Sequence, residues 1–181
     1  MSASMKWVVL DRDGVVNNDS PHYIKSAAEL QPNPGSLEAI ARLTQAGWRV
    51  CLATNQAGLG RKLFDYDAFA AMNAKLQKLV GERGGRIDAI AFAPEHPDHA
   101  TEMRKPSPGM LKDLARRLGV TTEGAWFVGD SAGDLLAAAA AGMRPALVHT
   151  GNGATTAASP QAEGMPVFAD LSAFVAHLLA G

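Results

Sequence analysis

The stretch Trp7-Val8-Val9-Leu10-Asp11-Arg12-Asp13-Gly14 decides the fold of this chain. Four apolar residues in a row, followed by a glycine that marks a turn, predict a short buried strand. Two carboxylates come directly after it, and an ionised carboxylate near a core is costly unless it is paired or binds a metal. In an open parallel sheet, ligands bind outside the carboxyl ends of the strands. The stretch therefore predicts a functional site where this strand ends.

Asp11 and Asp13 allow two interpretations. Side chains alternate along a strand, so the two carboxylates can face the same way, where they could hold a hard cation. One of them could also attack an electrophile. The alternative is a strand that ends in an ordinary Asx turn, with Gly14 letting the chain turn sharply. The choice between the two depends on the rest of the chain.

Length and composition favour one domain with a sizeable core. The chain has 181 residues, 47% of them hydrophobic, and 17 Lys and Arg against 18 Asp and Glu. This balance argues against a nucleic-acid binder, which would carry a basic excess. No apolar stretch is long enough to span a bilayer, and residues 1–6 are not typical of a signal peptide. We expect a monomeric, cytoplasmic protein, in which the single cysteine, Cys51, is a buried core residue and not a nucleophile.

Strands and helices alternate along the rest of the chain. Strands are expected at residues 7–10, 48–53, 87–93, 125–128 and 145–149. Helices are expected at residues 35–46, before Gly84-Gly85, at 108–118 with Ser107 as the cap, at 131–141 and after Asp170. Loops are expected at residues 15–34, 58–62, 94–106 and 154–166, the last one mobile. The alternation predicts one α/β domain over residues 1–181, with a doubly wound, mostly parallel sheet and helices on both faces.

Polar side chains also follow the second and fourth predicted strands. Thr54 and Asn55 end the second, Asp130 and Asp134 follow the fourth, and Lys105 precedes the helix that leads into the fourth. In a parallel sheet these groups converge with the two aspartates of the first strand. Carboxylate oxygens suit Mg²⁺, and the hydroxyl, amide and lysine can hold phosphate oxygens. Together they predict Mg²⁺-dependent phosphoryl transfer.

Four motifs resemble those of the haloacid dehalogenase (HAD) superfamily of phosphatases. They are Asp11-x-Asp13-Gly14, Ala53-Thr54-Asn55-Gln56, Arg104-Lys105-Pro106 and Gly129-Asp130-Ser131-Ala132-Gly133-Asp134. With Thr150-Gly151-Asn152-Gly153, they are similar to the subfamily that acts on heptose bisphosphates and histidinol phosphate. The resemblance covers residues 7–153 and implies a Rossmann-like strand order. Because the loop after the first strand has only about twenty residues, it also implies a domain without a separate cap.

The resemblance implies a role for each acidic residue. Asp11 would be the nucleophile that forms an aspartyl-phosphate. Asp13 would protonate the leaving alkoxide and then activate water. The Asp11 side chain, the main-chain carbonyl of Asp13 and Asp130 would hold Mg²⁺. Asp134 would either hold Lys105 in place or start the following helix.

The resemblance likewise implies which residues bind the substrate. Thr54 and Lys105 would bind the phosphoryl oxygens, and Asn55 would orient the substrate. Arg104 is the candidate for a remote phosphate, since a guanidinium recognises phosphate with two hydrogen bonds. Its alternative role is a solvated arginine in a polar loop. The leading hypothesis is a phosphatase of a small phosphorylated sugar, with the C7 phosphate of a heptose 1,7-bisphosphate as the preferred target.

Three other functions fit the same residues less well. Histidinol phosphate or another small phosphomonoester is the nearest alternative substrate. A phosphotransferase is possible in principle, because an aspartyl-phosphate can pass to an acceptor other than water. A phosphate-binding protein without catalysis is disfavoured, since a binder has no need of the second aspartate, Asp13.

The sequence departs from the subfamily at two places. Relatives commonly carry a zinc loop of three cysteines and one histidine, and the aligned positions here are Ala93, Glu95, Thr101 and Met103. His96 and His99 lie nearby, where they would either replace the missing ligands or, as we expect, face the solvent. Several relatives also have a lysine where this chain has Ser131, which removes a cation near the expected metal.

We predict that the protein holds no structural zinc, because none of the four aligned positions provides a thiolate or imidazole. The loop from Pro94 to Met103 would then be held by packing, prolines and hydrogen bonds alone. Elemental analysis of protein purified without a histidine tag tests this. Near-stoichiometric zinc would contradict the prediction and would make His96 and His99 the candidate ligands.

Overall fold

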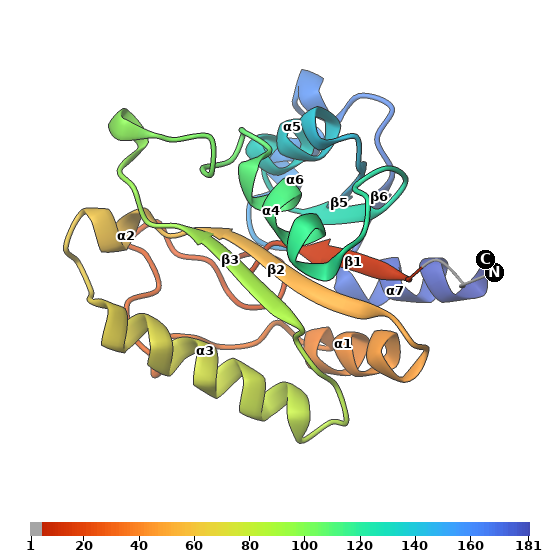
Figure 1. Ribbon diagram of the computed structural model, residues 1–181, viewed down its shortest axis with the longest axis horizontal. Coiled ribbons are helices and arrows are strands. Elements are labelled where there is room, and N and C mark those ends of the chain that lie inside the picture. The colour runs from red at the N-terminus through yellow and green to blue at the C-terminus, as the bar shows by residue number, and fades with distance from the viewer. Residues whose placement is uncertain (1–4) are drawn as a thin grey trace.

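The computed structural model describes residues 5–181, which form one open sheet of six parallel strands in the order β3-β2-β1-β4-β5-β6 (Figure 1). The strands are β1 Trp7–Leu10, β2 Arg49–Asn55, β3 Ala89–Ala93, β4 Trp126–Gly129, β5 Arg144–Val148 and β6 Val167–Phe168. From β1 the chain proceeds outward through β2 to β3 and then returns to β4 on the other side of β1. This reversal between β1 and β4 is the point at which doubly wound sheets bind their ligands.

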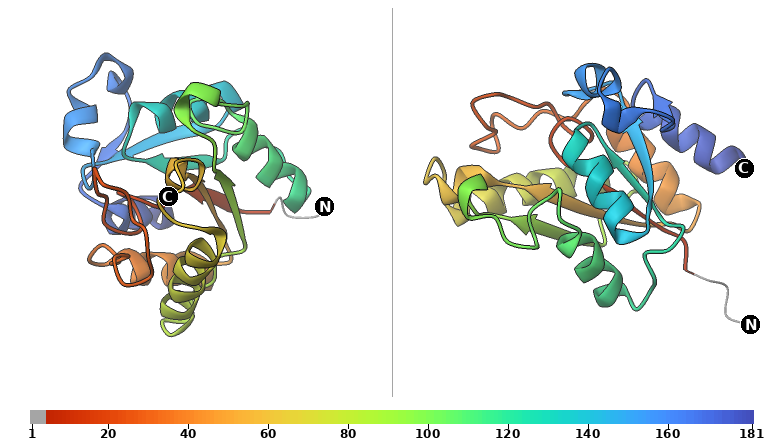
Figure 2. Two further views of the ribbon diagram at one scale, coloured as in Figure 1. Left: turned by 90° about the vertical axis from the view of Figure 1, so that its left-hand side faces the viewer. Right: turned by 90° about the horizontal axis from the view of Figure 1, so that it is seen from above.

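Helices cover both faces of the sheet (Figures 1 and 2). One face packs on α1 Ser36–Gln45, α3 Tyr66–Gly81 and α7 Leu171–Ala180. The other face packs on α4 Gly109–Leu118 and α5 Ala132–Ala141. Two short helices, α2 Ala57–Gly60 and α6 Gly153–Ala157, lie in the connections, as do the single 3₁₀ turns Pro97–His99 and Pro160–Ala162. None of the helices formed by residues 5–181 is long and apolar enough to cross a membrane.

β1 is uniformly apolar because it is covered from both sides. Val8 and Leu10 belong to the core under α1, α3 and α7, whereas Trp7 and Val9 belong to the core under α4 and α5. All four residues are buried. The strand therefore lacks the alternation of a half-exposed strand, and its position in the interior of the sheet follows from its composition.

The doubly wound, parallel α/β fold with helices on both faces is confirmed. The order 3-2-1-4-5 is also the Rossmann-like order that the family resemblance implied. The prediction for Cys51 is confirmed as well, since the side chain is buried in the core under α4 and α5. Burial raises the pKa of its thiol to about 12, so the group is protonated and unreactive at neutral pH.

Three local predictions were wrong. The segment 154–166 is not a plain loop, because it contains most of α6 and a 3₁₀ turn and leads into a sixth strand. That strand, β6, has only two residues and pairs with β5 alone, so it leaves no alternating pattern in the sequence. Residues 58–62 are partly helical in α2. Ser107 does not cap α4, which begins at Gly109 after Pro108 and has no side-chain cap.

Candidate active site

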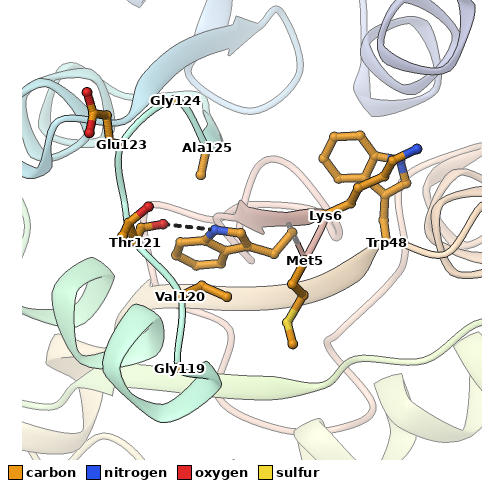
Figure 3. A pocket seen from close by; sticks show the side chains of 10 residues that line it. Met5, Lys6, Trp48, Gly119, Val120, Thr121, Glu123, Gly124 and Ala125 are labelled. Carbon is orange, nitrogen blue, oxygen red and sulfur yellow. Dashed lines mark hydrogen bonds between the residues drawn. The ribbon is translucent and has the colours of Figure 1, made fainter. Parts of the chain in front are cut away.

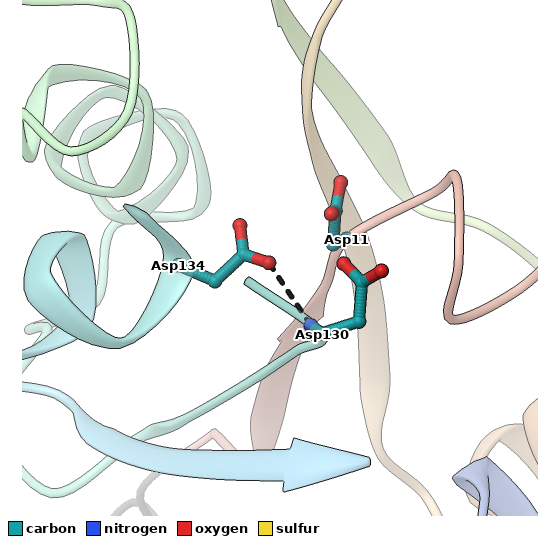
Figure 4. A group of neighbouring side chains, drawn as sticks. All are labelled: Asp11, Asp130 and Asp134. Atoms are coloured by element: carbon teal, nitrogen blue, oxygen red, sulfur yellow. Dashed lines mark hydrogen bonds between the residues drawn. The ribbon is translucent and has the colours of Figure 1, made fainter. Parts of the chain in front are cut away.

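Three aspartates meet at the carboxyl edge of the sheet, beside the reversal of strand order. Asp11 directly follows β1, Asp130 directly follows β4, and Asp134 lies in the first turn of α5 (Figure 4). All three are buried, and their nearest ligand atoms lie within 4.8 Å of one another. Among residues 5–181, these three form the one group of Asp, Glu, His or Cys side chains that lie close enough together to share a metal ion.

A buried lysine from another segment completes the cluster. Nζ of Lys105 lies 2.9 Å from Oδ1 of Asp11 and 2.7 Å from Oδ1 of Asp134, and it donates to the carbonyl of Ala53 at 2.9 Å. The Asn55 side chain holds the lysine backbone from both sides. Its Nδ2 donates to the Lys105 carbonyl and its Oδ1 accepts from the Lys105 amide, both at 3.0 Å. The end of β2 thus fixes where the ammonium lies.

Burial and the mutual charges of these groups shift their pKa values. Burial raises the pKa of Asp11 well above its ordinary value, and the charge of Asp134 adds to this while Lys105 opposes it. Burial and Asp134 also raise the pKa of Asp130 to about 7. Burial alone would lower the pKa of Lys105, but Asp11 and Asp134 raise it above its ordinary value. Burial disfavours the charge of Asp134 too, yet Lys105 lowers the pKa of this carboxyl.

One ammonium therefore faces three carboxylates. Asp134 is satisfied, because Lys105 contacts its Oδ1 while the amides of Asp130 and Ser131 donate to its Oδ2 at 3.0 and 3.1 Å. Asp11 and Asp130 retain an excess of negative charge in a buried place, which a divalent cation would relieve. A set of oxygen donors with this charge fits Mg²⁺ better than softer metals.

Asp134 fulfils both of the structural roles that were considered for it. It is paired with Lys105, and it starts α5 through a capping box in which Ser131 Oγ accepts from the Asp134 amide at 3.3 Å. Ser131, which stands where several relatives have lysine, is thus the N-cap of the helix. The first turn of α5 and the lysine are locked together through a single carboxylate.

The side chain of Asp13 lies apart from the acidic cluster. Its Oδ1 accepts from Arg12 Nε at 3.0 Å and from Asn17 Nδ2 at 2.8 Å, and Arg12 Nη2 forms an ion pair with the same oxygen at 2.9 Å. Its Oδ2 accepts from Gln56 Nε2 at 3.0 Å. The interpretation that the carboxylates of Asp11 and Asp13 together hold one cation is therefore not what the structure shows. The acidic group that is spaced for a metal ion contains Asp130 and not the carboxylate of Asp13, and the carbonyl of Asp13 stays a predicted ligand.

The loop after β5 holds Asp130 in place. The Asn152 amide donates to Asp130 Oδ2 at 2.8 Å, and Thr156 Oγ1 donates to the Asp130 carbonyl at 2.8 Å. Gly14 and Gly151, both with positive φ, leave the room that the carboxylate occupies, since a Cβ at either would overlap it. These contacts give a role to Gly151 and Asn152 of the Thr150-Gly151-Asn152-Gly153 stretch, which the sequence had marked by resemblance alone.

A cavity of about 620 Å³ opens beside this loop. It is lined by Asp19, Ser20, Pro21, Gly151 and Asn152. Asn152 connects it to the acidic cluster, since its Nδ2 donates to Asp19 Oδ2 at 2.7 Å while its backbone amide holds Asp130. A small polar molecule bound here would lie next to the carboxylates.

A second cavity, of about 600 Å³, lies at the other end of the sheet (Figure 3). The residues before and at the start of β1 form one wall, and the segment from Gly119 to Ala125 forms another. Trp7 lines it, and its indole Nε1 donates to the Thr121 carbonyl at 3.1 Å. None of the aspartates of the cluster is among its described lining residues. It is therefore separate from the candidate active site.

The chain is similar in sequence to known phosphatases. The profile of the HAD-hydrolase-like family matches residues 102–174. The D-glycero-β-D-manno-heptose-1,7-bisphosphate 7-phosphatase of Pseudomonas aeruginosa is 49% identical over 97% of this chain and 99% of its own. The enzyme of that name from Bordetella bronchiseptica is 51% identical over 97% of this chain and 98% of its own. The chain belongs to this family of HAD-like phosphatases.

Solved structures of the family share the fold along nearly the whole chain. The D,D-heptose 1,7-bisphosphate phosphatase of B. bronchiseptica, crystallised with magnesium and phosphate, superposes with a TM-score of 0.94 at 51% identity, covering 97% of this chain and 99% of that one. The corresponding protein from Burkholderia thailandensis gives a TM-score of 0.77 at 44% identity, with 97% and 99% covered. The family resemblance inferred from the four motifs is confirmed.

The zinc-loop region of this family member is held by its own hydrogen bonds. Glu95 Oε1 accepts from the amide and the hydroxyl of Thr101, and His96 Nδ1 accepts from the Asp98 amide at 3.1 Å. The rings of His96 and His99 lie 6.3 Å apart, centroid to centroid. Within residues 5–181, these two histidines do not form a group with the spacing of metal ligands. The absence of zinc stays a prediction.

Arg104 directly precedes Lys105 in the chain and makes one long hydrogen bond. Its nearest hydrogen-bond acceptor is the Glu95 carbonyl, at 3.4 Å from Nη1. The side chain is half-buried, and partial burial lowers the pKa of its guanidinium, which Glu95 partly offsets and Arg61 reinforces. Arg61 lies over the ring of Tyr23, at 5.9 Å. Arg61 and Arg104 are thus close enough to influence each other's charge, near Tyr23 of the polar loop that follows β1.

The glycine contacts around Asp130 lead to a testable prediction. Gly151→Ala should displace Asp130, because the new Cβ would overlap its Oδ2 and the Cα of Gly14. We expect a loss of roughly 10- to 100-fold in metal affinity or activity, as for other residues that orient metal ligands. Phosphate release measured against Mg²⁺ concentration checks this.

Gly164→Ala is the matched control for this change. Gly164 also has a positive φ, 73°, but a Cβ there meets no atom within 4 Å. It should lower the free energy of unfolding by about 1 kcal/mol through backbone strain and leave activity unchanged. Equal activity in the two variants would contradict the assignment of Asp130 to the metal site.

Proposed function

We propose that this protein is a Mg²⁺-dependent phosphomonoester hydrolase that removes the C7 phosphate of D-glycero-β-D-manno-heptose 1,7-bisphosphate. The observation that carries this proposal is the buried cluster of Asp11, Asp130, Asp134 and Lys105 at the switch point of the sheet. The relatives that are about half identical to the chain over nearly their full length carry the name of that activity. The substrate assignment rests on them, and the chemistry rests on the geometry.

Asp11 and Asp130, with the carbonyl of Asp13, would hold the magnesium ion. Bound there, it would neutralise charge on the transferring phosphoryl group. Lys105 and Thr54 would bind the phosphoryl oxygens. Both are buried, so the phosphoryl group would meet preformed donors in a place of low water content. The Asn55 side chain, which was predicted to orient the substrate, would act instead by holding the Lys105 backbone.

The proposed reaction has two halves with Asp11 as nucleophile. Oδ1 of Asp11 is already engaged by the Arg12 amide, at 2.8 Å, and by Lys105, which leaves Oδ2 for attack. As the bond from Oδ2 to phosphorus forms, the bond from phosphorus to the sugar oxygen breaks, and that oxygen takes a proton from Asp13. The sugar leaves as an alcohol, and the phosphoryl group stays on Asp11.

In the second half, water attacks the phosphorus of the aspartyl-phosphate while Asp13 accepts its proton. Inorganic phosphate leaves, and both aspartates return to their starting states. Asp13 can serve both halves because its carboxylate lies outside the Lys105 cluster and is partly exposed, at 21% of its side chain. We propose that it acts on its small phosphorylated substrate as a monomer, without a protein, nucleic-acid or membrane partner.

Histidinol phosphate remains the alternative substrate, because it would use the same reacting centre and differ only at the rim. The two guanidinium groups of Arg61 and Arg104 favour an anionic second group over the cationic amine of histidinol. This favours a bisphosphate.

Phosphate release from a panel of sugar bisphosphates, sugar monophosphates and histidinol phosphate, with and without Mg²⁺, tests the function. We expect heptose 1,7-bisphosphate to be hydrolysed fastest, and chelation to stop the reaction reversibly. Asp11→Asn should abolish turnover without unfolding the protein, because the two side chains are nearly isosteric. Asp13→Asn should be severely impaired while still binding phosphate and metal. Full activity of a contaminant-free Asp11 variant would rule out the nucleophile assignment.

Arg104→Ala tests the recognition of the second phosphate. A partly desolvated arginine–phosphate contact contributes about 1.5–3 kcal/mol, or roughly tenfold to a hundredfold in affinity. We expect kcat/KM to fall by that factor for the bisphosphate and hardly at all for the heptose 7-monophosphate. Equal losses on both substrates would mean that Arg104 serves the reacting centre or stabilises the fold. No loss on either would mean that it is a solvated arginine in a polar loop.

A further inference from the structure

The side chain of Gln56 bridges two groups of the proposed reaction. Its amide nitrogen, Nε2, lies 3.0 Å from Oδ2 of Asp13 and 2.8 Å from Oγ1 of Thr54. A primary amide has two N–H donors, so each hydrogen has one acceptor. Gln56 itself is 4% exposed, and Thr54 is 1% exposed, so the bridge is shielded from water.

The local backbone does not need this side chain. Gln56 is the residue before α2, but it makes no side-chain cap to that helix. Its backbone amide donates to the Ala93 carbonyl at 2.8 Å, which anchors the residue to the end of β3. The backbone of Gln56 is therefore positioned by main-chain contacts, and its side-chain amide remains available for contacts in the candidate active site.

The other oxygen of Asp13 is already fully occupied. Oδ1 accepts hydrogen bonds from Nε of Arg12 and Nδ2 of Asn17, and it is ion-paired with Nη2 of Arg12 at 2.9 Å. Oδ2 has Gln56 as its one partner among the described residues. The direction in which Oδ2 presents its remaining lone pair is thus set by Arg12 and Asn17 on one side and by Gln56 on the other.

We infer that Gln56 is a positioning residue with two effects. It aligns Asp13 Oδ2 with the leaving oxygen, and it orients the Thr54 hydroxyl so that its O–H donates to the phosphoryl group. This inference rests on the proposed function. Because Thr54 Oγ1 accepts from Gln56, its own O–H is free to donate to a phosphoryl oxygen. One amide thereby fixes the acid–base group and a phosphate donor relative to each other.

The two contacts have separable consequences. The Thr54 contact acts on the phosphoryl group, which is the same in every substrate. The Asp13 contact acts on protonation of the leaving oxygen, which matters for a sugar alkoxide and hardly at all for 4-nitrophenolate, a stable anion. The ratio kcat/KM covers the steps up to departure of the leaving group, so it reports the difference between these two kinds of substrate.

The test compares wild type with Gln56→Met on a sugar phosphate that wild type hydrolyses and on 4-nitrophenyl phosphate. We expect kcat/KM to fall by about 100-fold on the sugar phosphate, the effect of misplacing a reacting group. On 4-nitrophenyl phosphate the loss should be roughly tenfold or less, the effect of one neutral hydrogen bond. Gln56→Glu, which has nearly the same shape but lacks the two N–H donors, should show the same split and serves if the methionine variant does not fold.

Two controls make the outcome decisive. Gln77→Met, which removes the hydrogen bond from a side-chain amide on α3 to the Ile87 carbonyl, should leave both activities unchanged. In an Asp13→Asn background, Gln56→Met should lose the difference between the substrates, because the proton donor is already gone. Equal losses on both substrates, or no loss on the sugar phosphate, would overturn the inference. Failure of wild type to release phosphate from any sugar phosphate would instead overturn the proposed function.

Discussion

The site depends on one ion-pair network, in which the ammonium of Lys105 lies between Asp11 and Asp134. Three carboxylates are buried at one edge of the sheet, and without a positive charge among them burial and mutual repulsion would disfavour their ionised forms. The lysine is held by the carbonyl of Ala53 and by Asn55, both in β2, while Asp134 belongs to α5. Its ion pairs therefore join strand ends and a helix start that are distant in sequence.

The parallel sheet makes this arrangement possible. β1 is covered on both faces, so its apolar residues fix it in the interior, and the residue after it must leave the core at the switch point. β4 lies next to β1 and delivers Asp130 to the same place, and β2 lies on the other side and delivers Thr54. The chemistry is thus placed by strand order, and the loops that follow the strands supply the residues that hold each group.

The fold and the candidate site could be predicted from the sequence because each has a local signal. The run Trp7–Leu10 marks β1, and Asp11, Lys105 and Asp130 stand out as charges beside apolar strands. β6 was missed because two residues cannot show a period, and α2 because its four residues carry no apolar stripe. Arg12 and Gln56 were visible in the motifs, but their contacts to Asp13 depend on side-chain directions that only the packed structure defines. The same holds for the contact of Asn152 with Asp130, which joins residues 22 positions apart.

The central claim is that the carboxylate of Asp11 becomes phosphorylated during turnover. Enzyme quenched during steady-state hydrolysis and treated with borohydride would have any acyl phosphate reduced to the corresponding alcohol, and peptide mass spectrometry would locate it. We expect homoserine at position 11 and at no other aspartate, and only when both substrate and Mg²⁺ are present. If Asp11 stayed unmodified during turnover while another residue carried the trapped phosphoryl group, the assignment of Asp11 as nucleophile would be wrong.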